Sequence, residues 1–494
     1  MTEQPKRRRI KKRWILLIVV VVLAFAAMGA HLIWTASARR KLDAQIAEYK
    51  SLGEPIEPND FAGYGVVPGE NAVPDLQAAA RLIDRTTPAW DAFKDAQLSP
   101  PFPLRPDEIQ MLRALVGESN RTFPLVKSAS KLAGVDWKLS FQGPVTQIVF
   151  QDFNGYRDVT SVLHCDALLA HAEGDDTRAI KRASELLFLS RVMGKQPTFM
   201  SNLVSIAIAA IASQVSGEVG PELRIGTSAG EAPPQQVRDL IAQLLDETHT
   251  AQSQQDGLLG ERMLQLTMVR SMADGTISAM NGQRAAGRSL KGYVLTPTFL
   301  DDARLLVVHI TALRQAAAAS PDLPTFRQQA PKVPSSVQSQ RWRHLAANLL
   351  IWGVDRAVET NYRAVADRRL AATALAARMY AVDHGGKLPP SLDALVPGYL
   401  PEVPRDPTSA GQPLHYTSDD PDPRIWTLGE NGRDDGGRDI VPTESARWNK
   451  ENTDRVVHLR RQPRPEPPEP LDDGIGGYST DPSMAPGATA PALP

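Results

Sequence analysis

Side chains that could bind a metal ion follow one another in a glycine-rich segment near residue 435. They are Asn431, Asp434, Asp435 and Asp439. Calcium takes six to eight oxygen ligands, and glycines let backbone carbonyls turn inward beside such carboxylates. Arg433 and Arg438 lie within the same segment and offer the carboxylates other partners. The spacing leaves two interpretations open, a calcium site and a solvated acidic turn.

Two other motifs match part of a catalytic or metal site. Gly226–Gly230 (GTSAG) has the string of a hydrolase nucleophile elbow, but that elbow needs a helix directly after it, which Pro233 and Pro234 obstruct. His164 and His171 lie seven residues apart, about 10.5 Å along a helix, too far for easy shared ligation of one metal ion. We therefore assign no catalytic residue and no cofactor-binding residue, although the lack of a motif does not exclude an enzyme.

Composition narrows the classes of protein and partner. The chain has 494 residues, enough for two or three domains, with 55 Lys and Arg against 56 Asp and Glu and a formal net charge of -1. This balance gives no long-range attraction to nucleic acid, so we expect no such partner. Cys165 is the single cysteine, so no internal disulfide forms. Its apolar helical surroundings predict a buried, unreactive thiol.

An apolar run near the N-terminus predicts a membrane anchor. Trp14–Trp34 (WILLIVVVVLAFAAMGAHLIW) contains no charged residue and spans about 31 Å as a helix, which matches a bilayer core. Seven basic residues crowd its N-terminal side: Lys6, Arg7, Arg8, Arg9, Lys11, Lys12 and Arg13. The positive-inside rule then keeps residues 1–13 in the cytoplasm and the bulk of the chain outside. The alternative is a signal peptide cleaved at Ala36–Ala38, but the apolar run exceeds a normal signal core.

The elements that would carry these residues are mostly helical. We expect a polar helix and linker over 35–72 and a helical body over 73–355. Periodicity predicts helices at 106–116, 119–133, 235–282, 300–319 and 340–384. A helical hairpin at 157–193 resembles one tetratricopeptide-type helix pair, and Leu203–Val215, apolar on nearly every face but too short to span a bilayer, predicts a buried core helix.

Residues 361–460 hold an ordered series of turn and core residues. An alanine-rich helix runs into a Leu-Pro turn, a short LDAL helix, a YLPEVPRDP loop and the acidic glycine-rich segment. The series is Tyr380, Asp383, Gly385, Leu388, Pro389, Leu392, Leu395, Tyr399, Leu400, Pro404, Asp406, Pro407, Gly411, Pro413, Tyr416, Leu428, Gly429, Asn431, Gly432, Asp439 and Ile440. This series resembles the C-terminal domain of type II secretion pseudopilins, which implies a small α+β domain with a short antiparallel sheet, taken here as 356–460.

The resemblance also implies a ligand. In pseudopilins the equivalent loop binds calcium, and the Leu428 carbonyl, Asn431 and Asp439 occupy the matching positions. Other features depart from that family. The N-terminus lacks a prepilin-type Gly followed by Phe-Thr-Leu-x-Glu, and Thr408 replaces an aromatic residue. The missing prepilin motif argues against a processed filament subunit, whereas Thr408 bears on the geometry of its loop.

The sequence thus predicts a mainly α fold with an N-terminal transmembrane helix, a helical-hairpin body, a small α+β domain and a disordered Pro-rich tail at 461–494. We expect a non-enzymatic, membrane-anchored scaffold of the bacterial inner membrane, with envelope or secretion proteins as partners. The alternative is a periplasmic enzyme or ligand-binding protein with a pocket between helical pairs. Because the C-terminal domain has its own turns and small core, we expect a chain ending near residue 355 to keep a folded helical body. The oligomeric state is not specified by the sequence.

Overall fold

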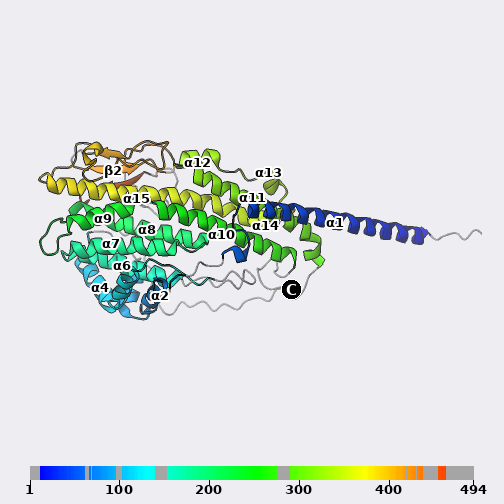
Figure 1. Ribbon diagram of the computed structural model, residues 1–494, viewed down its shortest axis with the longest axis horizontal. Coiled ribbons are helices and arrows are strands. Elements are labelled where there is room, and N and C mark those ends of the chain that lie inside the picture. Colours follow the sequence, from blue (N-terminus) through cyan, green and yellow to red (C-terminus); the bar gives the residue numbers. More distant parts are fainter. Residues whose placement is uncertain are drawn as a thin grey trace, which may run out of the picture. The chain divides into compact units, whose positions relative to one another are not determined.

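The protein is mainly helical and carries one small antiparallel sheet (Figure 1). The computed structural model describes residues 12–61, 66–67, 69–95, 103–139, 153–275, 290–418, 421–429, 431–437 and 454–462. The chain divides into a unit of residues 1–461 and a unit of residues 462–494, and the elements below belong to the first. The tail predicted to be disordered lies outside the described residues from 463 onward.

The helices begin and end as follows. They are α1 (Lys12–Ser51), α2 (Val73–Arg81), α3 (Pro88–Asp95), α4 (Pro106–Glu118), α5 (Thr122–Ala129), α6 (Phe153–Ala172), α7 (Asp176–Met193), α8 (Phe199–Val219), α9 (Pro234–Leu245), α10 (Thr248–Ala273), α11 (Leu290–Ala319), α12 (Leu323–Gln329), α13 (Ser335–Ser339), α14 (Leu345–Leu350) and α15 (Val354–Asp383). The short 3-10 turns are η1 (Pro58–Phe61), η3 (Gly220–Glu222), η4 (Ile351–Gly353) and η5 (Leu392–Leu395).

Helix α1 joins the apolar run to the body without a break. Its first part is long and apolar enough to span a membrane, as the sequence predicted, and none of its side chains from Trp14 to Trp34 is buried. Its second part is buried against α10 and α11 along one stripe, Ala38, Leu42, Ile46 and Tyr49. The spacing of four, four and three residues places these side chains on one helical face. The polar helix predicted after the anchor is therefore the same helix, held in the body's core.

The predicted hairpin at 157–193 is present as α6 and α7. Gly174 has a φ of +87°, a left-handed conformation that glycine adopts at low cost, and it ends α6. Asp175 caps α7 by accepting a hydrogen bond from the Arg178 N–H at 3.0 Å. Helix α8 packs against α6, α7, α10 and α15. The segment Leu203–Val215 thus lies in a core helix, which confirms its predicted role.

Three predicted helical stretches differ from the structure, and one of them, 340–384, forms α14, η4 and α15 instead of one helix. The stretch 235–282 forms two helices, α9 and α10, separated at Asp246 and Glu247. Buried Arg368 of α15 explains the break, because its guanidinium donates to the carbonyls of Gln243, Leu244 and Asp246 at 2.5–2.9 Å. Those carbonyls are acceptors that a helix end leaves without helical partners. The stretch 300–319 belongs to α11, which begins at Leu290 and contains Pro297.

The sheet consists of β1 (His415–Thr417), β2 (Arg424–Thr427) and β3 (Arg455–His458) in the order β1-β2-β3. All neighbouring strands are antiparallel, with Tyr416 opposite Ile425 and Ile425 opposite Val457. Figure 1 shows α15 between this sheet and helices α8 and α9, and α15 contacts all of them. This short antiparallel sheet agrees with the fold class predicted for residues 356–460.

Helix α15 shares its core with the helical body. Leu370, Leu375 and Met379 belong to the same buried cluster as residues of α6, α7, α8 and α9, and so do Leu395 and Ile425 of the sheet region. A boundary near residue 355 would remove the members of this cluster that come from α15 and the sheet region. The packing therefore argues against the expectation that a chain ending there keeps a folded body, and the experiments below use the full chain.

Candidate functional site

The acidic segment predicted to bind calcium lies at the edge of the sheet. Asp434 accepts hydrogen bonds from the Trp426 indole N–H at 2.9 Å and from the Gly436 N–H at 2.8 Å, and His415 lies 3.4 Å away. Asn431 donates its side-chain N–H to Asp435 at 3.0 Å. The structure thus brings Asn431, Asp434 and Asp435 together around β1 and β2.

Asp454 is a third carboxylate of this group and was not predicted. Its Oδ2 accepts from the N–H groups of Asp435 at 3.0 Å and Gly437 at 2.9 Å. Within the described residues, its buried Oδ1 has no hydrogen-bond partner. Burial raises the pKa of Asp454, and repulsion from Asp435 and Asp434 adds to this effect. The two backbone hydrogen bonds lower the pKa, but by less, so it stays above its ordinary value. A negative charge on Asp454 is therefore costly in the folded state.

The charge on Asp434 is held in the opposite way. Burial would raise the pKa of Asp434, but hydrogen bonds from Trp426 and Gly436, with His415 nearby, lower it. Asp434 is therefore stable as an anion in the folded protein. A bound cation would stabilise the negative charge on Asp454, which is costly without it.

The remaining predicted ligands are placed differently. The N–H of Leu428 donates to buried Asp406 at 2.9 Å, which fixes the end of β2 beside the loop. Asp439 lies outside the described residues. Across the described ranges, no three His, Cys, Asp or Glu side chains are grouped closely enough to hold a metal ion. Calcium would therefore need ligands from backbone carbonyls as well as from these carboxylates.

The GTSAG motif lies in a loop. Ser228 is exposed, and its N–H donates to the Glu231 carboxylate at 2.9 Å. The next helix begins only at Pro234. Gly230 has a φ of +83°, and a Cβ added there would lie 2.4 Å from the Gly174 carbonyl oxygen. The motif is thus a tight turn against the α6–α7 connection, and its serine lacks the strand and helix of a nucleophile elbow.

The two histidines and the cysteine lie in the core of the helical body. His171 contacts Asp176 at 2.5 Å, whereas His164 lies 4.0 Å from Glu218, so they have separate partners. Cys165 is fully buried, and burial raises the pKa of its thiol, which keeps it protonated. None of the three is arranged to share a ligand.

A cavity of about 670 Å³ opens beside the end of α2. Its lining includes Gln77, Arg81, Asp84, Arg85 and Tyr156. Arg85 also pairs with buried Asp158 of α6. The cavity thus combines polar and charged side chains with the apolar surface of Leu82 and Ile83.

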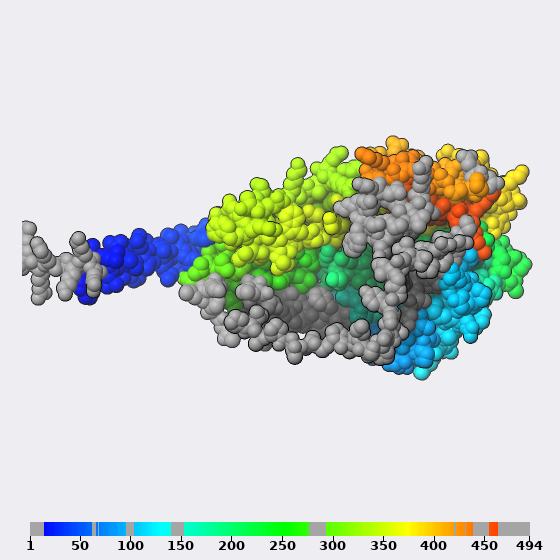
Figure 2. Space-filling view, turned by 180° about the vertical axis from the view of Figure 1, so that it is seen from behind, coloured from blue at the N-terminus to red at the C-terminus, as the bar shows by residue number. Residues whose placement is uncertain are grey.

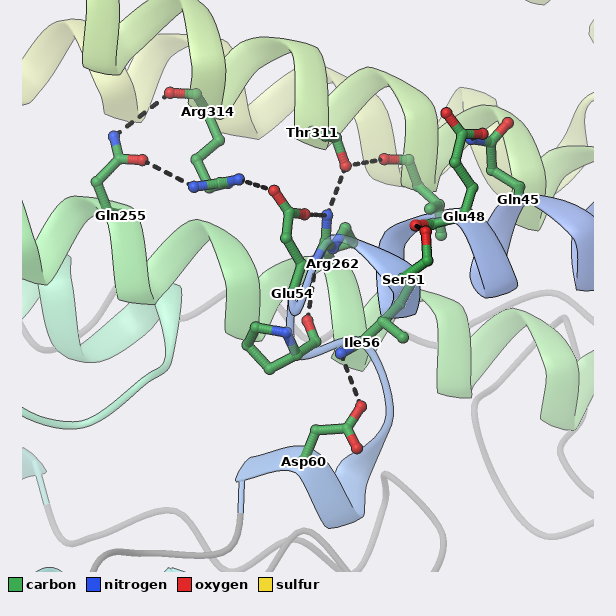
Figure 3. A network of polar contacts seen from close by, with 12 residues as sticks. Gln45, Glu48, Ser51, Glu54, Ile56, Asp60, Gln255, Arg262, Thr311 and Arg314 are labelled. Atoms are coloured by element: carbon green, nitrogen blue, oxygen red, sulfur yellow. Dashed lines mark hydrogen bonds and ion pairs between the residues drawn. The ribbon is translucent and has the colours of Figure 1, made fainter.

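The junction between anchor and body contains a polar network that sequence analysis did not find (Figure 3). Arg262 of α10 is 1% exposed and donates to Glu54 at 2.6 Å, to Thr311 of α11 at 2.7 Å and to the Pro55 carbonyl at 2.8 Å. Arg314 of α11 pairs with the other oxygen of Glu54. Glu54 lies three residues after the end of α1, so this junction network ties the end of the anchor helix to two long helices of the body.

Further contacts hold the same segment in place. Ile56 is fully buried, and the N–H groups of Ile56 and Glu57 both donate to Asp60 at 2.8–3.0 Å. The Arg262 guanidinium carbon lies over the ring of Tyr49 of α1, 5.0 Å from the centroid of that ring. Burial lowers the pKa of Arg262, whereas Glu54 raises it through its hydrogen bond and charge. The segment after α1 is therefore fixed to the body in its described part.

No family model, curated protein or solved structure matches this chain. The function is therefore inferred from the residues and contacts above. A sequence signal for the junction was limited to Arg262 itself, which is a charged residue close to the apolar Met263 and Leu266. Asp454 had no such signal, because it reaches the acidic segment only through the pairing of β3 with β2.

Proposed function

We propose that this protein is a membrane-anchored, extracytoplasmic scaffold of the bacterial envelope. The observation that carries the proposal is the continuity of α1, whose apolar half is mostly exposed and whose other half packs one buried stripe against the body. A helix fixed in this way holds the body at a set height and direction relative to a membrane. That property suits a protein that positions other proteins rather than one that diffuses on a flexible tether.

We propose that the partners are envelope or secretion proteins, associated with a system like type II secretion. This inference rests on the resemblance of residues 361–460 to the pseudopilin C-terminal domain. The structure supports it with a short antiparallel sheet in that region. Tyr399 donates to Asp383 at 2.8 Å and Tyr416 to the Pro389 carbonyl at 2.6 Å, so residues of the resembling series are paired with one another.

The orientation is tested by a pair of reporters fused after Pro494. A phosphatase that is active only outside the cytoplasm should be active there, and a reporter that is active only inside should be silent, because the basic cluster before Trp14 stays in the cytoplasm. A control variant that replaces the seven basic residues of 6–13 by glutamine should reduce the phosphatase signal. Activity of the cytoplasmic reporter in the wild-type fusion would refute the topology.

We also propose that the acidic segment binds calcium. Asp454, with its raised pKa and its unpaired Oδ1 among the described residues, supports this assignment. If the affinity is the weak one of extracellular modules, calcium at about ten times its Kd should stabilise the fold by roughly 1.4 kcal/mol. The gain should be largest at neutral pH and should fade as the pH falls through the raised pKa of Asp454, because protons then neutralise the carboxylate.

Thermal melting of the full-length protein with calcium and with chelator measures this effect. Asp439→Ala and Asp434→Asn should each remove most of the calcium-dependent shift. Asp393→Ala, an exposed carboxylate in η5 of the same region, is the matched control and should leave the shift unchanged. Identical melting with calcium and with chelator would contradict the site.

The second candidate function is ligand binding in the cavity beside α2. The observation that favours it is the concave site of about 670 Å³ with Arg81, Arg85 and Asp84 on its lining, a volume within the range of small-molecule sites. Arg81 would suit a small anionic ligand, since Arg85 is already paired with Asp158. The cavity lies at α2 and α6, away from the acidic segment, so both functions could coexist in one chain.

A further inference from the structure

A group of exposed apolar side chains lies on α14 and its flanking residues. Leu345, Leu349 and Trp352 are 43%, 68% and 48% exposed, and Trp342, just before the helix, is 71% exposed. The spacing of four and three residues places the first three on one outward face. We call Trp342, Leu345, Leu349 and Trp352 the tryptophan patch. Large apolar side chains gathered on a surface mark a contact with another apolar phase.

The opposite face of the same segment is held firmly in the body. Ala346, Ala347 and Ile351 are buried in the cluster that also contains α1 and α11. Fully buried Asp302 of α11 accepts hydrogen bonds from the N–H groups of Ala346 at 2.9 Å and Ala347 at 3.1 Å, and it contacts His344 at 2.7 Å. Because the inner face of α14 is held in this way, the side chains of the patch on its outer face stay exposed.

The patch lies beside the end of the apolar run of α1. The Arg343 guanidinium stands 5.3 Å from the ring centroid of Trp34, the last residue of that run. The Trp34 indole N–H donates to Asp301 of α11 at 3.2 Å, next to the Asp302 that holds α14. Figure 2 shows the yellow-green surface of the body meeting the blue helix where α1 leaves it. Arg343 thus places the patch level with Trp34.

Helix α11 contacts the apolar run still closer to its centre. The ring of Tyr293 lies 4.8 Å from the His31 ring, and its hydroxyl is 3.7 Å from the Met28 sulfur. Because His31 precedes Trp34 by three residues, this contact is about 4.5 Å deeper along α1. Val294 beside it is 55% exposed. When α1 spans the bilayer, the part of α11 beside His31 lies deeper than Trp34. The surface of the body next to Trp34 then lies within the membrane interface.

The chemistry of this surface fits lipid. Tryptophan and tyrosine favour the level of the headgroups, where one part of the ring is apolar and the other hydrated. The exposed side chains of Arg341 and Arg343 lie on either side of Trp342 in the chain and can pair with anionic headgroups. An amphipathic segment with aromatic and leucine residues on one face and arginines at its rim is typical of an interfacial helix.

We propose that the tryptophan patch lies in the outer leaflet beside α1 and forms a second contact between the body and the bilayer. The proposal rests on the proposed membrane anchorage of α1. The occupant to which it commits is the lipid of the anchoring membrane, because the contact of Arg343 with Trp34 makes the patch continuous with the membrane-spanning helix. A second copy of the chain or a partner protein on the patch is an outcome of the test.

The test uses full-length protein in nanodiscs of phosphatidylethanolamine and phosphatidylglycerol. Single cysteines replace Leu349, Val22 of α1 and Val382 of α15, and each carries an environment-sensitive fluorophore. Buried Cys165 should not react, which labelling of the wild-type protein checks. Val382 is the matched control, because it is an exposed valine about 42 Å along α15 from its start. Lipids with a spin label on the acyl chain quench fluorophores that contact them.

The label at 349 is expected to be quenched several-fold more strongly than the label at 382, with a blue-shifted emission. The label at 22 should also be quenched. Quenching at 22 with none at 349 would overturn the patch and leave the anchorage intact. No quenching at 22 would overturn both. A blue-shifted but unquenched label at 349 would show that protein covers the patch, which also overturns the proposal.

Discussion

Replacing Arg262 by methionine should lower the free energy of unfolding by about 3–5 kcal/mol, the cost of breaking a buried ion pair by removing one partner. Methionine keeps much of the side-chain volume, but Glu54, Thr311 and the Pro55 carbonyl lose their shared donor. Denaturant unfolding of the full-length protein in detergent, followed by circular dichroism, measures the loss. Proteolysis near Glu54 should increase in parallel, because the segment after α1 is released.

Two matched variants show whether the effect belongs to the junction network. Arg356→Met changes an exposed arginine near the start of α15 and should alter stability little. Glu54→Gln added to Arg262→Met should recover part of the loss, since it removes the carboxylate left without its buried partner. If Arg262→Met and Arg356→Met unfold at the same denaturant concentration, the network does not hold the anchor to the body.

Gly260→Ala should also destabilise the protein, by about 1–3 kcal/mol in spite of alanine's better helix propensity. A Cβ at position 260 of α10 would lie 1.8 Å from the carbonyl oxygen of Pro197, which is backbone and cannot rotate away. Helix α10 must therefore move from the start of α8. The midpoint of denaturant unfolding measures this change.

Gly217→Ala in α8 is the matched control. A Cβ there meets only the methyl groups of Val457, at 3.7 Å, which is ordinary contact. The helix propensity term should then dominate and stabilise the protein by up to about 1 kcal/mol. A loss of stability at both glycines would mean that the close approach of α10 to Pro197 does not explain the effect at 260.

Local patterns predicted the elements whose cause is local. The apolar run of α1, the α6–α7 hairpin with its Gly174 turn and the core helix α8 all follow from composition and spacing over a few turns. The break between α9 and α10 does not, because the side chain that ends α9 comes from Arg368, more than a hundred residues later. Pro297 similarly looks like a boundary in sequence but lies inside α11.

The site residues divide in the same way. Asn431, Asp434 and Asp435 are neighbours in sequence and remain neighbours in the structure. Asp454 joins them only because β3 pairs with β2, and a strand pairing across a long connection has no local signature. Arg262 and Glu54 lie 208 residues apart, so nothing in either local sequence predicts their contact.

Because α1 is unbroken, a change in the tilt of its membrane-spanning half is transmitted to the body. Forty helical residues extend about 60 Å without a break between the two halves, and the junction network fixes the segment after them to the body. A bilayer thinner than the apolar run makes a spanning helix tilt. Any such tilt must then swing α15 and the sheet through the same angle, so the thickness of the surrounding lipid is converted into the direction in which the distal end of the protein points.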